Sequence, residues 1–214
     1  LIYKCNCYMN IVTKKKKIFI KKFKNKEEDE DEIDTDTTVE PKIKSIGNKI
    51  YFYDDVESNN ILELKNCICE LNSTLIMESM KYDFEPVINL HIYSSGGDVF
   101  MGLSMYDFIK ANKIPIYTYI DGMIASSATF IFLAGKRRFM SENAMVLIHQ
   151  ISTSFWGKFE DLKDEYSNSQ KIMDIVKRIY KDNTTMSKNQ MKTILQRELY
   201  LNYQACKEIQ FITN

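Results

Sequence analysis

The 214-residue sequence lacks the bulk features that identify several classes of protein. Basic and acidic residues number 29 each, so net charge gives no reason to expect a nucleic acid as partner. No apolar run approaches the roughly 18 residues of a membrane-spanning helix. Composition therefore predicts a soluble protein of the cytoplasm or of an organelle lumen, with neither nucleic acid nor membrane as partner.

Motifs for metal and cofactor binding are also missing. The five cysteines contain no CxxC pair, which argues against a zinc site or a disulfide framework and favours a reducing compartment. Cys67 and Cys69 stand two residues apart and would not share a helix face. Neither GxxxxGK[ST] nor GxGxxG occurs, so the adjacent Gly96 and Gly97 are weak candidates for a phosphate site. We expect no metal and no cofactor in this chain.

The first 42 residues differ in composition from the rest. Residues 14–26 are rich in lysine, and residues 27–36 are almost wholly acidic. Such blocks are typical of solvated, disordered segments, whereas an organellar transit peptide would contain arginine and serine and few acidic residues. We predict a charged, disordered tail over residues 1–42 and a folded domain over residues 43–214.

Strand-like and helix-like patterns alternate along that domain. Strands are predicted at 46–54, 87–93, 116–120 and 144–150. Between the first two strands, apolar residues recur at helical spacing and form a single stripe: Ile61, Leu64, Ile68, Leu71 and Leu75. The order strand, helix, strand, helix, strand predicts crossover connections and a largely parallel sheet, which is an α/β fold.

Several helix ends carry their own signals. Ser58 is predicted to cap the first helix, and Gly135 to close the apolar helix "SATFIFLA" in the left-handed conformation. A long amphipathic helix is predicted from Lys158 to about Lys181, and the next helix begins at Ser187, where Gln190 completes a capping box. The remaining residues predict a strand, a helix and a strand.

Small residues stand where two predicted strands turn into helices. The sequence has only seven glycines, yet Gly96 and Gly97 are adjacent, and "DGMIASSATF" at 121–130 contains a glycine, an alanine and two adjacent serines ahead of its apolar end. In open α/β sheets, catalytic groups gather at the carboxyl ends of strands. A nucleophilic Ser126 at a helix entrance would have unpaired N–H donors beside it for an oxyanion. The alternative is that Ser126 and Ser127 only cap the helix.

A base and an acid can be nominated beside this serine. His149 is one of two histidines and ends an apolar strand, from which its imidazole would reach a neighbouring strand's loop. His91 lies in mid-strand and is interpreted as structural. Glu198 precedes a short strand-like run and is the nominated acid, although the residues alone leave other acids open.

Three segments together resemble a known family. They are "IYSSGGDVFMGLSMYDFIK", "DGMIASSATFIFLAGKRRFMSENAMVLIHQ" and "RELYLNYQACKE", and they resemble the proteolytic subunit of the Clp protease, a self-compartmentalising serine peptidase. The resemblance runs in order from about Ile46 to Thr213. It implies the ClpP/crotonase-like fold, a layered β-sheet with crossover helices and a protruding long helix, the handle.

On the matching positions the resemblance implies a mechanism. Ser126 would be the nucleophile, His149 the base and Glu198 the acid, with the backbone N–H groups of Gly97 and Ser127 as oxyanion donors. The family hydrolyses peptide bonds of unfolded polypeptides inside two stacked seven-membered rings, which the long helix joins. A hexameric AAA+ ATPase delivers the substrates, so ATP is used by that partner and this subunit needs no cofactor.

The sequence departs from the family pattern at four places. Glu198 stands where aspartate is usual, and Gln196 replaces an acid that often takes part in an inter-ring ion pair. Ser95 replaces the proline before the glycine pair, and the segment after His149 reads "ISTSFWGK" instead of a Pro-led, glycine-containing one. Trp156 in this segment either lines the substrate cleft or packs.

These departures keep other functions open. The nearest rival is a catalytically impaired (ClpR-type) ring subunit with a structural role. An acyl-CoA enzyme of the crotonase fold would share the backbone oxyanion site but would not require the serine–histidine pair. A relative of the signal-peptide peptidases would need a lysine base.

Overall fold

The computed structural model describes residues 43–213, and the predicted tail over residues 1–42 lies outside the described residues. The helices and strands follow in the order β1 (Ile43–Ile46), β2 (Lys49–Phe52), α1 (Ser58–Tyr82), β3 (Ile88–Ser94), α2 (Val99–Ala111), β4 (Ile116–Ala125), α3 (Ala128–Leu133), β5 (Arg137–Met140), β6 (Met145–Leu147), α4 (Phe159–Asn183), α5 (Lys188–Gln196), β7 (Tyr200–Leu201) and α6 (Tyr203–Glu208).

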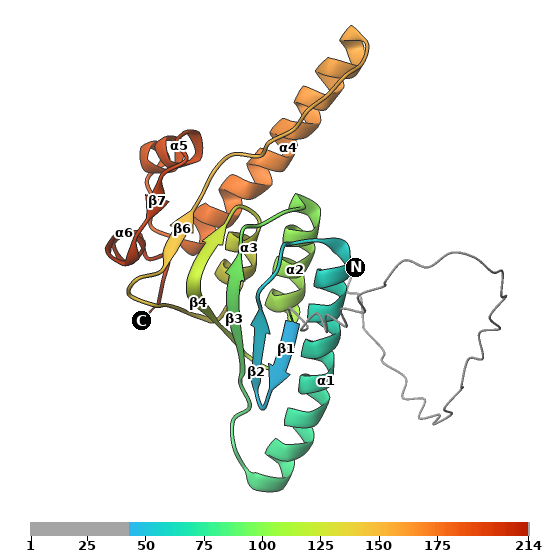
Figure 1. Ribbon diagram of the computed structural model, residues 1–214, viewed down its shortest axis with the longest axis vertical. Coiled ribbons are helices and arrows are strands. Elements are labelled where there is room, and N and C mark those ends of the chain that lie inside the picture. The colour runs from blue at the N-terminus through green and yellow to red at the C-terminus, as the bar shows by residue number, and fades with distance from the viewer. Residues whose placement is uncertain (1–42, 214) are drawn as a thin grey trace, which may run out of the picture. The chain divides into compact units, whose positions relative to one another are not determined.

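The strands form a mixed sheet whose centre is parallel. Its order is β1-β2-β3-β4-β6-β7, with β5 pairing to β4 beside β6. Strands β2, β3, β4 and β6 run parallel, and β5 is parallel to β4. Only β1 and β7, at the two edges, are antiparallel to their neighbours. The predicted α/β fold with a largely parallel sheet is confirmed (Figure 1).

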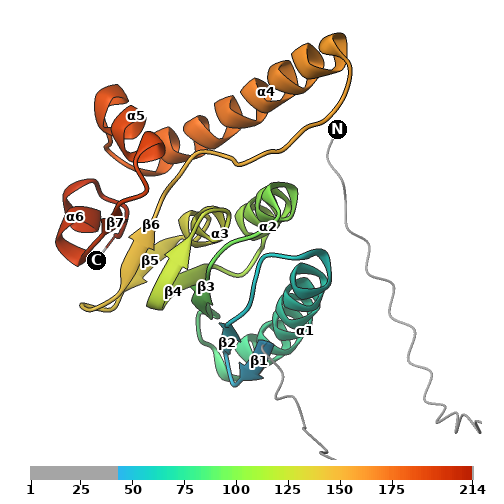
Figure 2. The ribbon, with the colours of Figure 1, turned by 45° about the horizontal axis from the view of Figure 1, so that its top comes forward.

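Helices α1, α2 and α3 cover one face of the sheet, and the core lies between them and the strands (Figures 1 and 2). Four of the five stripe residues predicted for α1 are buried, and Leu71 is half-buried. From β3 every second side chain points into this core: Ile88, Leu90 and Ile92. Burying these apolar side chains is the main favourable contribution to folding.

The opposite face of the sheet carries a row of stacked rings. Tyr51, His91, Tyr119 and Phe139 are register partners on four neighbouring strands. Successive ring centroids lie 4.9, 4.6 and 4.8 Å apart. The Nδ1 atom of His91 also lies 2.8 Å from a carboxylate oxygen of Asp121. His91 therefore packs in this row of rings. Because successive side chains of a strand point to opposite faces of the sheet, the rings lie on the face away from the core.

Two predictions near the start of the domain are wrong in detail. The strand predicted at 46–54 is observed only as β2, and its first residues form the turn of a hairpin with β1, in which Gly47 has a φ of 59°. Ser58 does not cap α1, because the helix already includes it as its first residue. Glu57 occupies the N-cap position without a side-chain hydrogen bond. The serine is one residue too late for its hydroxyl to serve the free N–H groups.

The prediction for Gly135 is also wrong. The C-cap of helix α3 is Ala134 in a right-handed conformation, and Gly135 has no positive φ. A Cβ at Gly135 would overlap the side chain of Thr118, whose hydroxyl donates to the carbonyl oxygen of Phe132 at 2.8 Å. This glycine is therefore needed for close packing of the chain against β4.

The later strands differ from the prediction in three ways. Strand β4 continues to Ala125, five residues beyond the predicted end at 120, and β5 was not predicted. The last predicted strand is absent, because residues 209–213 after α6 form none. The small residues of 121–125 thus belong to a strand that runs up to the serines.

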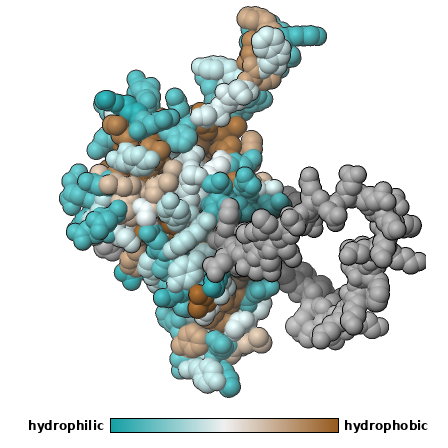
Figure 3. Space-filling view, viewed as in Figure 1, coloured by the Kyte–Doolittle hydropathy of each residue, from teal (hydrophilic) through white to brown (hydrophobic). Residues whose placement is uncertain are grey.

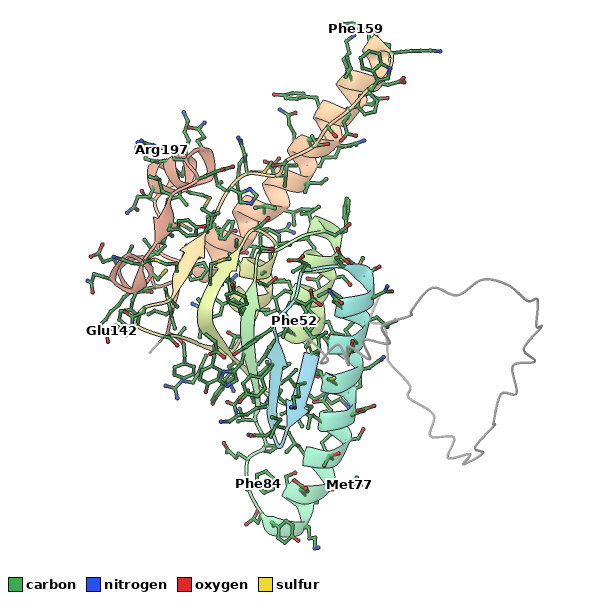
Figure 4. All side chains as sticks on the ribbon, in the orientation of Figure 1. Phe52, Met77, Phe84, Glu142, Phe159 and Arg197 are labelled. Atoms are coloured by element: carbon green, nitrogen blue, oxygen red, sulfur yellow. The ribbon has the colours of Figure 1, made fainter. Side chains whose placement is uncertain are left out.

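Helix α4 projects from the rest of residues 43–213, as Figures 1 to 3 show. Its second half is anchored by the buried residues Val176, Ile179 and Tyr180, while Phe159 lies at its outer end (Figure 4). The predicted long helix is thereby confirmed, and α5 begins with the predicted capping box of Ser187 and Gln190. Within residues 43–213, no helix combines the length and apolarity that a membrane-crossing segment needs.

Candidate active site

Three turns at the carboxyl ends of adjacent parallel strands make up the candidate site. Ser94 of β3 pairs with Ile124 of β4, and Ala125 of β4 pairs with Leu147 of β6. The glycine pair, Ser126 and His149 follow within three residues of these strand ends. The sheet therefore places the predicted glycine turn, serine and histidine along one edge, as expected for catalytic groups in this type of fold.

Ser126 occupies the sharp turn between β4 and α3. Its φ of 55° is left-handed, a conformation that costs an L-residue about 1–2 kcal/mol. The turn is held at both ends: the Ser126 N–H donates to the Leu147 carbonyl oxygen (3.0 Å), and the Thr129 N–H donates to the Ser126 carbonyl oxygen (3.0 Å). The side chain is half-exposed, and its hydroxyl has no hydrogen-bond partner within residues 43–213. A substrate carbonyl can reach it.

The glycine pair approaches the serine closely. Gly96 has a φ of 94°, and a Cβ there would lie 2.6 Å from the Ser126 Cβ and 2.7 Å from the carbonyl oxygen of Ala125. The turn is fixed by Val56, whose N–H donates to the Gly96 carbonyl oxygen (2.7 Å) and whose carbonyl oxygen accepts from the Asp98 N–H (2.8 Å). Only glycine permits this approach.

Two backbone N–H groups at the site have no hydrogen-bond partner in the described part of the chain. Within residues 43–213, neither the Gly97 N–H nor the Ser127 N–H donates a hydrogen bond. Val56 makes its two hydrogen bonds with Gly96 and Asp98, the residues on either side of Gly97. The Gly97 N–H itself therefore points away from Val56. Unpaired N–H groups beside a serine are what an oxyanion site requires.

His149 has a defined protonation pattern. Its ring is half-exposed, and its Nδ1 lies 2.6 Å from the carbonyl oxygen of Gln150. A carbonyl oxygen can only accept, so Nδ1 carries the proton and donates it. In the neutral ring Nε2 then has its lone pair free, which is the tautomer a general base needs.

Glu198 and His149 flank the same end of the pairing between β6 and β7. The strands are antiparallel with Leu147 opposite Tyr200, and His149 lies two residues after this pair while Glu198 lies two residues before it. The Glu198 side chain is exposed, and the described residues show no hydrogen bond between it and His149. The partner of Nδ1 is the Gln150 carbonyl, which sequence reasoning missed because a main-chain group carries no signature.

Comparison with known proteins identifies the family of the chain. A family model described as Clp protease matches residues 51–214. The chain belongs to the Clp protease family. Over 120 residues it is 28% identical to the ATP-dependent Clp protease proteolytic subunit of Deinococcus radiodurans; the match covers 55% of this chain and 59% of that relative's length.

Solved structures of the Clp protease family share the fold. ClpP1 from Listeria monocytogenes has a TM-score of 0.64 and 20% identity, covering 78% of this chain and 89% of that one. A point mutant of the same protein has a TM-score of 0.64 and 21% identity, with coverages of 75% and 85%. The predicted ClpP-type fold with its protruding helix is therefore confirmed.

Within this family fold, Ser127 lies in a different environment from Ser126. Its side chain is 2% exposed, and its hydroxyl is buried without a hydrogen-bond partner in the described part of the chain. Gly102 of α2 makes room for it, since a Cβ there would lie 2.8 Å from the Ser127 Cβ. This contact was not predicted, because a glycine inside a helix gives no sign of what packs against it.

Residues 43–213 contain no group of three or more histidine, cysteine or acidic residues placed to hold a metal ion. Cys206 is buried, and burial raises the pKa of its thiol to about 12, so it stays protonated and unreactive near neutral pH.

Proposed function

We propose that the chain is a proteolytic subunit of an ATP-dependent Clp protease and acts as a serine endopeptidase. The observation that carries the proposal is that Ser126, His149 and two N–H groups without a partner in residues 43–213 all follow the ends of neighbouring parallel strands. A subunit relieved of catalysis would have no chemical need for this combination.

The reaction follows from the positions of these groups. The Ser126 oxygen attacks the peptide carbonyl carbon, and Nε2 of His149 takes the hydroxyl proton. The N–H groups of Gly97 and Ser127 bind the oxyanion of the tetrahedral intermediate. His149 returns the proton to the leaving amine as the C–N bond breaks, which leaves an acyl-enzyme that water hydrolyses.

Glu198 is proposed as the third member of the triad. Its carboxylate would replace the Gln150 carbonyl as acceptor for the Nδ1 proton and stabilise the imidazolium that forms during attack. The pairing of β6 with β7 supports this role, because His149 and Glu198 flank the same end of it. The longer glutamate side chain must be accommodated where the family usually has aspartate.

The proposed assembly is two stacked seven-membered rings that enclose the active sites. Helix α4 would join the rings, and a hexameric AAA+ ATPase would deliver unfolded polypeptides and use the ATP. The projection of α4 from the rest of the described domain supports this arrangement. The family relationship supports it as well.

A second candidate is a ring subunit with a structural role and impaired catalysis. The observation that favours it is the missing hydrogen bond between Glu198 and His149 in the described chain. Labelling with a fluorophosphonate probe separates the two functions. We expect labelling of the wild-type protein at Ser126 and none of Ser126→Ala. Ser127→Ala should still be labelled, because it loses only a buried hydroxyl. An assembled wild-type ring that resists the probe would establish the structural role.

Hydrolysis of a short peptide tests the proposed acid. Glu198→Ala should lower kcat by roughly 10- to 100-fold. A serine protease whose histidine is held in the wrong tautomer loses roughly 10⁴-fold in kcat. The loss here should be smaller, because the Gln150 carbonyl still accepts the Nδ1 proton of His149 and keeps the correct tautomer. Glu142→Ala, an exposed acid elsewhere, serves as the matched control. Full activity of Glu198→Ala, with none for Ser126→Ala, would remove Glu198 from the triad.

A further inference from the structure

A chain of hydrogen bonds lies directly behind the proposed nucleophile. Besides its N–H, Thr129 directs its hydroxyl to the Ser126 carbonyl oxygen, at 2.5 Å. The Tyr180 hydroxyl lies 2.6 Å from the same Thr129 oxygen. A threonine hydroxyl has one hydrogen, which goes to the Ser126 carbonyl, so Tyr180 must be the donor to Thr129. The order is Tyr180 to Thr129 to Ser126.

This chain is closed to solvent and comes from two helices. Tyr180 of α4 is 1% exposed, and Thr129 of α3 is fully buried. The Tyr180 ring packs edge-on against Phe130, with ring centroids 5.9 Å apart. Burial raises the pKa of Tyr180, which keeps its hydroxyl protonated and able to donate. Hydrogen bonds in such surroundings are stronger and orient their partners more firmly than those in water.

The acceptor of this chain belongs to the peptide unit that joins Ser126 to Ser127. A trans peptide is planar, so its C=O and N–H point in opposite directions. Two donors from Thr129 draw the Ser126 carbonyl inward, and the Ser127 N–H is thereby turned outward, where it has no partner within residues 43–213. Hydrogen bonds accepted by a carbonyl also polarise its peptide and strengthen the N–H as a donor.

We propose that Tyr180 and Thr129 are positioning residues that hold the Ser127 N–H in the oxyanion site. The inference rests on the proposed function, since it assigns these residues a part in the same reaction. Neither residue touches the substrate. Their effect is on the transition state, in which the oxyanion has formed, and much less on the bound substrate.

The test compares the same substitution at a buried and at an exposed tyrosine. Tyr180→Phe removes only the buried hydroxyl, and Tyr82→Phe does the same at the last residue of α1, which is 64% exposed. For peptide hydrolysis by the full-length assembled protein, we expect Tyr180→Phe to lower kcat about tenfold with KM unchanged, the rate equivalent of about one hydrogen bond. Tyr82→Phe should match the wild type. Equal kcat values for the two variants would overturn the inference.

A second pair of variants covers the case in which Tyr180→Phe fails to assemble. Thr129→Val replaces the hydroxyl by a methyl group of similar size, and Thr129→Ser restores the hydroxyl. We expect kcat to fall for the valine variant and to return to within threefold of wild type for the serine variant, at equal assembled mass. Equal kcat for these two would also overturn the inference. If the wild-type protein neither hydrolyses peptides nor reacts with the fluorophosphonate probe, the proposed function itself fails. If every variant instead has the wild-type kcat, the proposed function stands and only the positioning role of Tyr180 and Thr129 is removed.

Discussion

Two adjacent serines show how much the environment of one residue decides. Ser126 has a left-handed φ and a half-exposed hydroxyl, whereas the Ser127 hydroxyl is buried with no hydrogen-bond partner in the described chain. The turn between β4 and α3 separates them, since it exposes one side chain at the sheet edge and buries the next against Gly102. Substituting each serine by alanine should therefore have different effects: loss of the exposed hydroxyl at Ser126 and, at Ser127, loss of a buried hydroxyl without a partner in residues 43–213.

Ser127 should contribute nothing to stability through its hydroxyl. A buried polar group without a partner carries a desolvation cost, so Ser127→Ala should leave the free energy of unfolding unchanged or raise it by up to about 1 kcal/mol. Ser94 is equally buried, at 2% exposure, but its hydroxyl accepts from the Gly96 N–H at 3.1 Å. Ser94→Ala should therefore lower the free energy by about 1–3 kcal/mol. Urea unfolding measures the free energy of unfolding of both variants. Equal losses of this free energy for Ser127→Ala and Ser94→Ala would contradict the prediction.

The sequence alone supplied candidates at the site but could not supply every contact. Ser126 and His149 follow the ends of β4 and β6; the sequence predicted both strands and a largely parallel sheet, and the structure shows that the two strands are neighbours. The hydrogen bond of His149 to the Gln150 carbonyl and the burial of Ser127 depend on main-chain geometry and on tight packing. Neither leaves a pattern in residue type, so neither could be predicted.

At the scale of helices and strands, strong periodicity predicted elements well and single residues predicted their ends less well. The stripe of α1, the strand β3 and the long helix α4 all agree with the structure. The capping box of Ser187 and Gln190 was correct because two residues signal together. The single-residue signals at Ser58 and Gly135 were wrong, since a serine or a glycine has other uses in a packed fold.

The glycine turn after β3 offers a test at this scale. Gly96 and Gly47 both have positive φ, but a Cβ at Gly47 would meet nothing within 4 Å, whereas one at Gly96 would overlap the turn that holds Ser126. Gly47→Ala should cost about 1 kcal/mol of stability and leave kcat unchanged. Gly96→Ala should displace Ser126 and lower kcat about 100-fold or more. Peptide hydrolysis by correctly assembled protein distinguishes them, and normal activity of Gly96→Ala would show that the close approach is dispensable.

At the scale of the whole described domain, the projecting part of α4 carries apolar side chains that the fold leaves uncovered. The segment before the helix and its outer half expose Phe155, Trp156, Phe159, Leu162 and Tyr166. Trp156 is 99% exposed. Clusters of exposed aromatic residues mark contact surfaces more often than scattered single ones do. This supports the proposed role of α4 in joining two rings.

Removing this apolar surface should separate the rings without unfolding the subunit. Burial of a side chain the size of Phe contributes about 1.5–3 kcal/mol, and a ring-to-ring contact would repeat that contribution in every subunit. The double variant Trp156→Ser, Phe159→Ser should therefore show half the wild-type mass by light scattering at equal protein concentration. Tyr82→Ser is the matched control, since Tyr82 is an exposed aromatic at the far end of α1 (Figure 1). It should keep the wild-type mass. A double variant that also keeps the full mass would mean that the outer part of α4 does not hold the rings together, and the contact would have to be sought elsewhere on the subunit.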